Sequence, residues 1–75
     1  MTLRDLLTAR DVTMEAAGLL ADVDASTISR ICAGQVRARP KTVVKLARAL
    51  GISAKRAQAM CDAHYSAAHP DEVAA

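Results

Sequence analysis

The segment from Thr13 to Gly34 constrains the fold of this 75-residue chain more than any other part of its sequence. A helical pattern of apolar residues runs over residues 14–21 and is interrupted at Asp22, a residue that tolerates the left-handed backbone conformation. A second helix is predicted over residues 25–33, and Gly34 provides its C-terminal stop. The segment therefore predicts two short helices joined by a tight turn.

The residues around this turn meet the requirements of a helix-turn-helix motif. Gly18 is small where the two helices must cross, and Asp22 suits a positive φ at the turn. Val23, Ile28 and Ile31 are apolar on the sides that the motif buries. The alternative is an ordinary helical hairpin in a small bundle, which rarely requires both the glycine and the turn residue. The pattern therefore favours a second helix that enters a DNA groove.

The remaining sequence predicts three further helices. They cover residues 2–10, residues 40–50 beginning at Pro40, and the stretch from the cap at Ser53 to about His64. Alanine is the commonest residue and Tyr65 is the only aromatic one, which favours closely packed helices over a sandwich of sheets. We therefore expect an all-α, compact five-helix domain over residues 1–65 and a flexible C-terminal tail over residues 66–75.

Two further expectations concern burial and capping. From the helix over residues 14–21, the residues expected to point inward are Ala17, Leu20 and Ala21. In the fifth helix, those available for burial are Ala57, Met60 and Cys61. Thr13 and Asp24 are placed to cap the two helices of the motif through their side-chain oxygens.

The charged residues are distributed unevenly, although the net charge is only +2. Residues 1–29 carry a net charge of −3, residues 30–56 carry +8 with no acidic residue, and residues 57–75 carry −3. An acid-free basic run of this length is typical of a surface that meets a polyanion, with a solvated basic face as the alternative of equal weight.

A family resemblance extends over the chain from Leu3 to Ile52. The matching residues are Thr13, Ala21-Asp22-Val23, Ser26-Thr27-Ile28-Ser29-Arg30-Ile31, Gly34, Arg39-Pro40 and Val44-Lys45-Leu46-Ala47-Arg48-Ala49-Leu50-Gly51-Ile52. Together they resemble the Cro/repressor (xenobiotic-response-element) family of helix-turn-helix DNA-binding proteins. The resemblance implies a lambda-repressor-like domain of five helices, whose third helix, at about residues 25–33, lies in the major groove of double-stranded DNA.

The chain departs from the family pattern at four positions. Met14 stands where the family usually has a Gln that bonds a phosphate and braces the recognition helix, and Cys32 stands where a Glu is frequent. Asp22 replaces the turn glycine, and Gly18 replaces a small alanine. The loss of the Gln and the Glu removes polar bracing around the recognition helix and leaves the expected fold intact.

The third helix and the basic run after it supply the expected DNA contacts. The residues expected to face base edges are Ala25, Ser26, Ser29 and Arg30. The residues expected to contact the DNA backbone are Thr13, Thr27, Gln35, Arg37, Arg39 and Lys41. Arg30 is the candidate for a bidentate contact with guanine, the commonest specific contact in the major groove.

These contacts predict a sequence-specific transcriptional regulator, and we expect a small phage-type Cro or repressor in the bacterial cytoplasm or nucleoid. One bidentate contact favours the correct base over a wrong one by about 1–3 kcal/mol, so a single domain discriminates weakly between DNA sequences. A homodimer on a palindromic operator would add a second half-site. Met60, Tyr65 and nearby alanines could supply the dimer surface or cap the monomer core, and both alternatives are open. The rival function is an antitoxin-like protein-interaction module whose apolar fifth helix grips another chain.

Other classes of function have little support in the sequence. There is no Gly-rich phosphate loop and no carboxylate pair in a predictable cleft, and Cys32 has no histidine close in sequence. Cys61, His64 and His69 are loosely spaced for zinc, so we interpret them as a packed thiol and solvent-facing histidines. No apolar run approaches the roughly 20 residues of a membrane span, and Asp5 argues against a signal peptide. We therefore expect no enzyme, no cofactor, no metal and no membrane, with both thiols free in a reducing cytoplasm.

Overall fold

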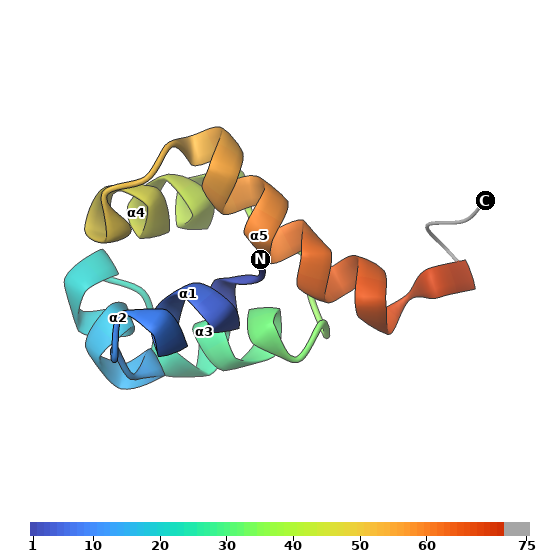
Figure 1. Cartoon of the computed structure of the whole chain (residues 1–75), viewed down its shortest axis with the longest axis horizontal. Coiled ribbons are helices and arrows are strands. Elements are labelled where there is room, and N and C mark those ends of the chain that lie inside the picture. Colours follow the sequence, from blue (N-terminus) through green and yellow to red (C-terminus); the bar gives the residue numbers. More distant parts are fainter. Residues whose placement is uncertain (72–75) are drawn as a thin grey trace.

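The computed structural model describes residues 1–71 and confirms the all-α prediction, with five helices and no strand over that range. In chain order the helices are α1 (Leu3–Ala9), α2 (Met14–Ala21), α3 (Ala25–Cys32), α4 (Pro40–Leu50) and α5 (Ala54–Ala68). α2 pairs with α3 and also contacts α4, whereas α5 packs on α1, α3 and α4. The C-terminal half of α5 extends beyond the other helices (Figure 1).

Local sequence signals set most of the helix boundaries. The side-chain oxygens of Thr2, Thr13 and Ser53 accept hydrogen bonds of 3.0–3.2 Å from N–H groups in the first turns of α1, α2 and α5. Pro40 begins α4, where its fixed φ fits the helix. Asp24 precedes α3 but makes no side-chain capping bond, so that expectation is wrong. Its exposed carboxylate acts on α3 only through its charge.

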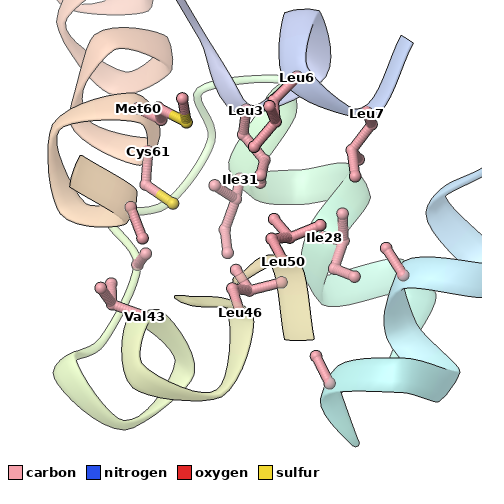
Figure 2. Packing of buried hydrophobic residues seen from close by; sticks show 14 of the residues in the cluster. Leu3, Leu6, Leu7, Ile28, Ile31, Val43, Leu46, Leu50, Met60 and Cys61 are labelled. Carbon is pink, nitrogen blue, oxygen red and sulfur yellow. The ribbon is translucent and has the colours of Figure 1, made fainter. Parts of the chain in front are cut away.

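One apolar core fills the space between the helices and contains buried residues of all five, and Figure 2 shows its larger side chains, among them Leu6, Ile31 and Leu46, pointing toward one another. The largest fully buried side chains are Leu3, Ile28, Ile31, Leu46 and Cys61. Each burial of a large aliphatic side chain contributes about 1.5–3 kcal/mol to folding. The buried faces of α1 and α3 thus meet those of α4 and α5. None of the helices over residues 1–71 has both the length and the apolar character needed to cross a bilayer.

The burial predicted for Leu20 is wrong. Leu20 is 66 % exposed and its neighbour Leu19 is 86 % exposed. The buried residues of α2 are instead Ala17, Gly18 and Ala21. Because these residues are small, α2 approaches α3 and α4 closely, and both leucines are left on its outer surface.

The fifth helix ends at Ala68, four residues later than the predicted end at His64. The added turn is rich in alanine, which has the highest helix propensity of all residues. Met60 is 3 % exposed and belongs to the monomer core. It is therefore available neither for a dimer interface nor for binding to a partner protein. The predicted tail includes residues 72–75, which lie outside the described residues, and its flexibility stays a prediction.

Candidate nucleic-acid interface

The turn between α2 and α3 has the geometry that the sequence predicts. Asp22 adopts the left-handed conformation, with φ 56° and ψ 48°, and ends α2. The N–H of Val23 donates to the carbonyl oxygen of Gly18 at 2.9 Å. A Cβ on Gly18 would lie 2.5 Å from the carbonyl oxygen of Val23 and 3.3 Å from the nitrogen of Ala25. The orientation of α3 on α2 therefore depends on the absence of a side chain at Gly18.

α3 has one buried face and one exposed face. Ile28 and Ile31 anchor the buried face in the core. Of the four residues predicted to read bases, three are exposed, namely Ser26, Ser29 and Arg30, and the fourth, Ala25, is half-buried. The hydroxyl and guanidinium groups of α3 are thus available on the side away from the isoleucines.

A surface cavity lies between α3, the loop over residues 33–39 and the start of α4, and we call it the basic cavity. Its volume is about 480 Å³, and its polar lining residues are Thr27, Arg30, Arg37, Arg39 and Thr42. Among residues 1–71, no acidic residue lines it. Three guanidinium groups and two hydroxyl groups on one cavity are the donors that recognise phosphate oxygens.

The basic cavity brings together half of the predicted backbone contacts. Thr27, Arg37 and Arg39 line it, next to Arg30 from the predicted base-reading set. Gln35 and Lys41 are exposed but lie outside its lining. Thr13 is also outside it, at the start of α2, where its hydroxyl oxygen accepts a hydrogen bond from the next turn.

Sequence reasoning missed two residues of this region, Thr42 and Tyr65. Thr42 lies in the first turn of α4, and the helix start at Pro40 is the signal that places it there. Tyr65 comes from α5, and the Cζ atom of Arg37 lies 4.4 Å from its ring centroid. No sequence signal linked Tyr65 to Arg37, since the two residues lie in different segments of the chain.

The start of α4 adds positive potential to the basic cavity. Its N-cap is Arg39, which makes no side-chain capping hydrogen bond, and its first turn contains no acidic residue. The N-terminus of a helix carries a partial positive charge and binds anions through its N–H groups. The basic cavity thus combines three arginine charges with a helix terminus.

The start of α3 has the opposite charge. A second surface cavity, of about 430 Å³, is lined by Glu15, Asp22 and Asp24 together with Leu19 and Ala25, among others. α3 therefore begins beside three carboxylates and ends beside three arginines. A polyanion is repelled at the first end and attracted at the second.

Two other basic side chains of the chain serve the fold. Lys45 donates from Nζ to the carbonyl oxygen of Asp22 at 3.4 Å, at the C-terminus of α2. Arg10 donates from Nη1 to the carbonyl oxygen of Leu50, at the C-terminus of α4. Cations at these positions satisfy terminal carbonyl groups and the negative end of the helix dipole.

Both cysteines are free and buried. Burial raises the pKa of the Cys61 thiol to about 11, and it also raises the pKa of Cys32. A thiol that stays protonated is a poor nucleophile and a poor metal ligand. The packed thiols predicted from the sequence are confirmed.

The histidines are not solvent-facing, so that part of the interpretation is wrong. His64 accepts a hydrogen bond at Nε2 from the backbone N–H of Arg4, at 3.2 Å. Nε2 of His69 lies 2.9 Å from the carbonyl oxygen of Gly34. Both rings are half-buried against other segments. Among residues 1–71, no three His, Cys, Asp or Glu side chains gather in a way that could hold a metal ion.

Comparison with known proteins agrees with this geometry. A family model described as helix-turn-helix matches residues 3–56, which is well over half of the chain. The match covers α1 to α4, including the turn, α3 and the basic cavity. The family is a DNA-binding, non-enzymatic one. No curated protein and no solved structure matches the chain significantly. The chain belongs to the Cro/repressor (xenobiotic-response-element) type of the helix-turn-helix family.

Proposed function

We propose that this protein is a sequence-specific transcriptional regulator that places α3 in the major groove of double-stranded DNA. The observation that carries the proposal is the position of Arg30. It is exposed on α3, on the side away from the buried Ile28 and Ile31, and it lines the basic cavity. One residue thus joins the helix that reads bases to the surface that attracts phosphates.

The proposed base contacts differ in their value for specificity. Arg30 can donate two parallel hydrogen bonds to the O6 and N7 atoms of guanine, which discriminates by about 1–3 kcal/mol. Ser26 and Ser29 can donate to or accept from any base edge, so they discriminate weakly. Ala25 offers a methyl group to a thymine methyl, although it also lines the second surface cavity with Glu15, Asp22 and Asp24.

The proposed backbone contacts centre on the basic cavity. Thr27, Arg37 and Arg39 would meet phosphate oxygens there, assisted by Thr42 and the start of α4. Lys41 lies in the first turn of α4 and would extend this contact along the strand. Gln35 and Thr13 would contact the backbone separately, on either side of α3. Such contacts fix the register of the protein on the duplex without reading its sequence.

Selection of duplexes from a random pool, followed by titration of the selected duplex, tests this proposal. Arg30→Ala should raise Kd for the selected duplex about 10- to 100-fold and relax the choice of base at one position. Lys55→Ala is the matched control, because it removes one exposed positive charge on α5 outside the basic cavity. It should leave the Kd for selected and for random duplexes near the native values. Absence of binding at low salt would refute the proposal, and equal binding by Arg30→Ala would exclude Arg30 from base reading.

We also propose that two copies bind a palindromic operator, as a small Cro or repressor of the phage type. The support is energetic, because one bidentate contact per domain gives too little discrimination to find a single site among many. The selected sequences should show two half-sites about 10 base pairs apart, centre to centre. Sedimentation of the protein–duplex complex should give two chains per duplex. A selected site without symmetry, bound by one chain, would contradict the dimer.

A protein-interaction module is the second candidate, and one observation favours it. Leu19 and Leu20 expose large apolar side chains next to each other on α2. Contiguous exposed apolar patches mark protein interaction sites, and these two leucines would be the centre of such a patch. A chain that binds no duplex at low salt, but whose capture of a partner is abolished by the double variant Leu19→Ser, Leu20→Ser, would support this candidate over the first.

A further inference from the structure

The end of α5 contacts the loop that follows the recognition helix. A Cβ on Gly34 would lie 2.5 Å from the Cβ of Ala68 and 2.6 Å from the carbonyl oxygen of His64, so the backbone of the loop lies directly on α5. Nε2 of His69 lies 2.9 Å from the carbonyl oxygen of Gly34. Since a carbonyl oxygen only accepts, the histidine donates this hydrogen bond. Packing and a hydrogen bond together fix the loop to α5.

Three side chains stack beside this contact. The rings of Tyr65 and His69 have centroids 4.1 Å apart and planes inclined by 20°. The Cζ atom of Arg37 lies 4.4 Å from the centroid of Tyr65. A cation at this distance is attracted to the ring electrons, and a stacked guanidinium can donate hydrogen bonds in its own plane. Arg37 is therefore held by α5 at the same time as it lines the basic cavity.

We propose that Tyr65 and His69 are positioning residues for DNA binding, which hold the guanidinium of Arg37 at the basic cavity for contact with a backbone phosphate. The inference rests on the proposed function. A long exposed side chain loses rotamer freedom when it binds, and a side chain that is held beforehand loses less. The Tyr65 ring bears no net charge, so stacking on it leaves the positive charge of the guanidinium in place. The interface therefore includes α5 residues beyond the family match, which ends at residue 56.

A double-mutant cycle on the selected duplex tests this inference. Tyr65→Leu keeps an apolar side chain but removes the ring, and it should raise Kd about two- to fivefold at low salt. In an Arg37→Ala background, Tyr65→Leu should leave Kd unchanged, because no guanidinium is left to hold. His69→Ala removes the second ring and the bond to Gly34, and it should show the same dependence on Arg37. Tyr65→Phe is the matched control, because it keeps the ring and should keep the native Kd.

Each outcome of the cycle decides one claim. Equal losses in both backgrounds would mean that Tyr65 acts through packing alone, and this result would overturn the inference while leaving the proposed function in place. An unchanged Kd for Tyr65→Leu would do the same. If the native chain bound no duplex at low salt, the proposed function would fail and the inference with it. NMR of the free protein tests the stack directly: the Arg37 Nε–H resonance should be shifted by the ring in the native chain and in Tyr65→Phe, but not in Tyr65→Leu.

Discussion

Gly34 and Gly51 adopt the same left-handed backbone conformation, with φ of +73° and +66°, but they have different neighbours. Gly34 ends the segment of the recognition helix, and its backbone touches Ala68 and His64 of α5. A Cβ on Gly51, after α4, would meet no atom of the described residues within 4 Å. Substitutions at the two positions therefore distinguish the energetic cost of a left-handed backbone conformation from the cost of a steric overlap with α5.

Substitution of these glycines by alanine should destabilise the protein to different extents. Gly51→Ala adds only the strain of a left-handed alanine, about 1–2 kcal/mol. Gly34→Ala adds the same strain and an overlap with α5, for a total of about 2–5 kcal/mol. Urea unfolding of both variants measures the difference. Equal losses would show that the loop moves away from α5 without cost.

His64 makes the stability of the fold depend on pH. Burial, and then the positive charge of Arg4, lower the pKa of His64 below its ordinary value of 6.5. The neutral ring also accepts the N–H of Arg4, which the protonated ring cannot do. The unfolded chain therefore binds this proton more readily than the folded chain. The contribution to stability is complete above pH 6.5 and is lost as the pH falls through the lowered pKa of the folded state.

The free energy of unfolding should therefore decrease between neutral pH and the lowered pKa of His64. His64→Gln retains an acceptor for the N–H of Arg4 but does not titrate, so the part of the slope due to His64 should disappear in this variant. Chemical unfolding at a series of pH values, native chain against His64→Gln, gives this difference. Parallel curves would contradict the assignment.

At the scale of the elements, the starts of α2 and α3 differ in how they are capped. The hydroxyl oxygen of Thr13 accepts a hydrogen bond from the N–H of Ala16 at 3.0 Å. Asp24 occupies the N-cap position of α3, but its side chain makes no capping hydrogen bond. Thr13→Ala should cost about 1 kcal/mol. Asp24→Ala loses only the interaction of a charge with the helix dipole, about 0.5 kcal/mol. Because it also removes a carboxylate from the acidic end of α3, it should tighten DNA binding at low salt.

Thermal unfolding and duplex titration of these two variants separate the effects. Thr13→Ala should be the less stable variant and Asp24→Ala the tighter binder. A weaker complex for Asp24→Ala would mean that this carboxylate supports the recognition helix more than it repels phosphate.

The elements that were predicted correctly are those with local signals. The bounds of α2 and the turn at Asp22 follow from cap and turn chemistry within a few residues, and the family match confirms the motif. The exposure of Leu20 could not be predicted, because which side of a short helix is buried depends on how closely α3 and α4 approach. The alanines at the end of α5 were a local signal for a longer helix, but the contact of His69 with Gly34, more than 30 positions earlier in the chain, could not be predicted.

The residues of the candidate site also fall into two groups, those that local sequence signals predict and those that they do not. Arg30, Arg37 and Arg39 are close in sequence, so one basic run predicted them together, and the basic cavity brings them together in space. Thr42 reaches the same region from the first turn of α4, which the helix start at Pro40 could have indicated, whereas Tyr65 reaches it from α5 through tertiary packing alone. Hydropathy and charge patterns carry no information about such contacts.

At the scale of the whole molecule, the uneven charge predicts how binding depends on salt. Four cations, Arg30, Arg37, Arg39 and Lys41, are proposed to face the duplex, so log K should fall with log salt with a slope of about −3 to −4 per chain. Arg39→Ala should reduce the slope by about 0.9, and Lys55→Ala should leave it unchanged. Titration at five salt concentrations measures these slopes. A native slope near zero would contradict backbone contact, and twice the expected slope would indicate two chains per duplex.

The stack on α5 gives the protein an optical property that follows from its composition. Tyr65 is the only aromatic ring of Phe, Trp or Tyr type in the chain, and a guanidinium covers it. The intrinsic fluorescence of the folded protein therefore originates at a single place, next to the side chain proposed to meet a phosphate. If DNA draws Arg37 away from the ring or presses it closer, the emission of the unlabelled protein changes. The chain thus carries its own spectroscopic reporter at the edge of the proposed interface.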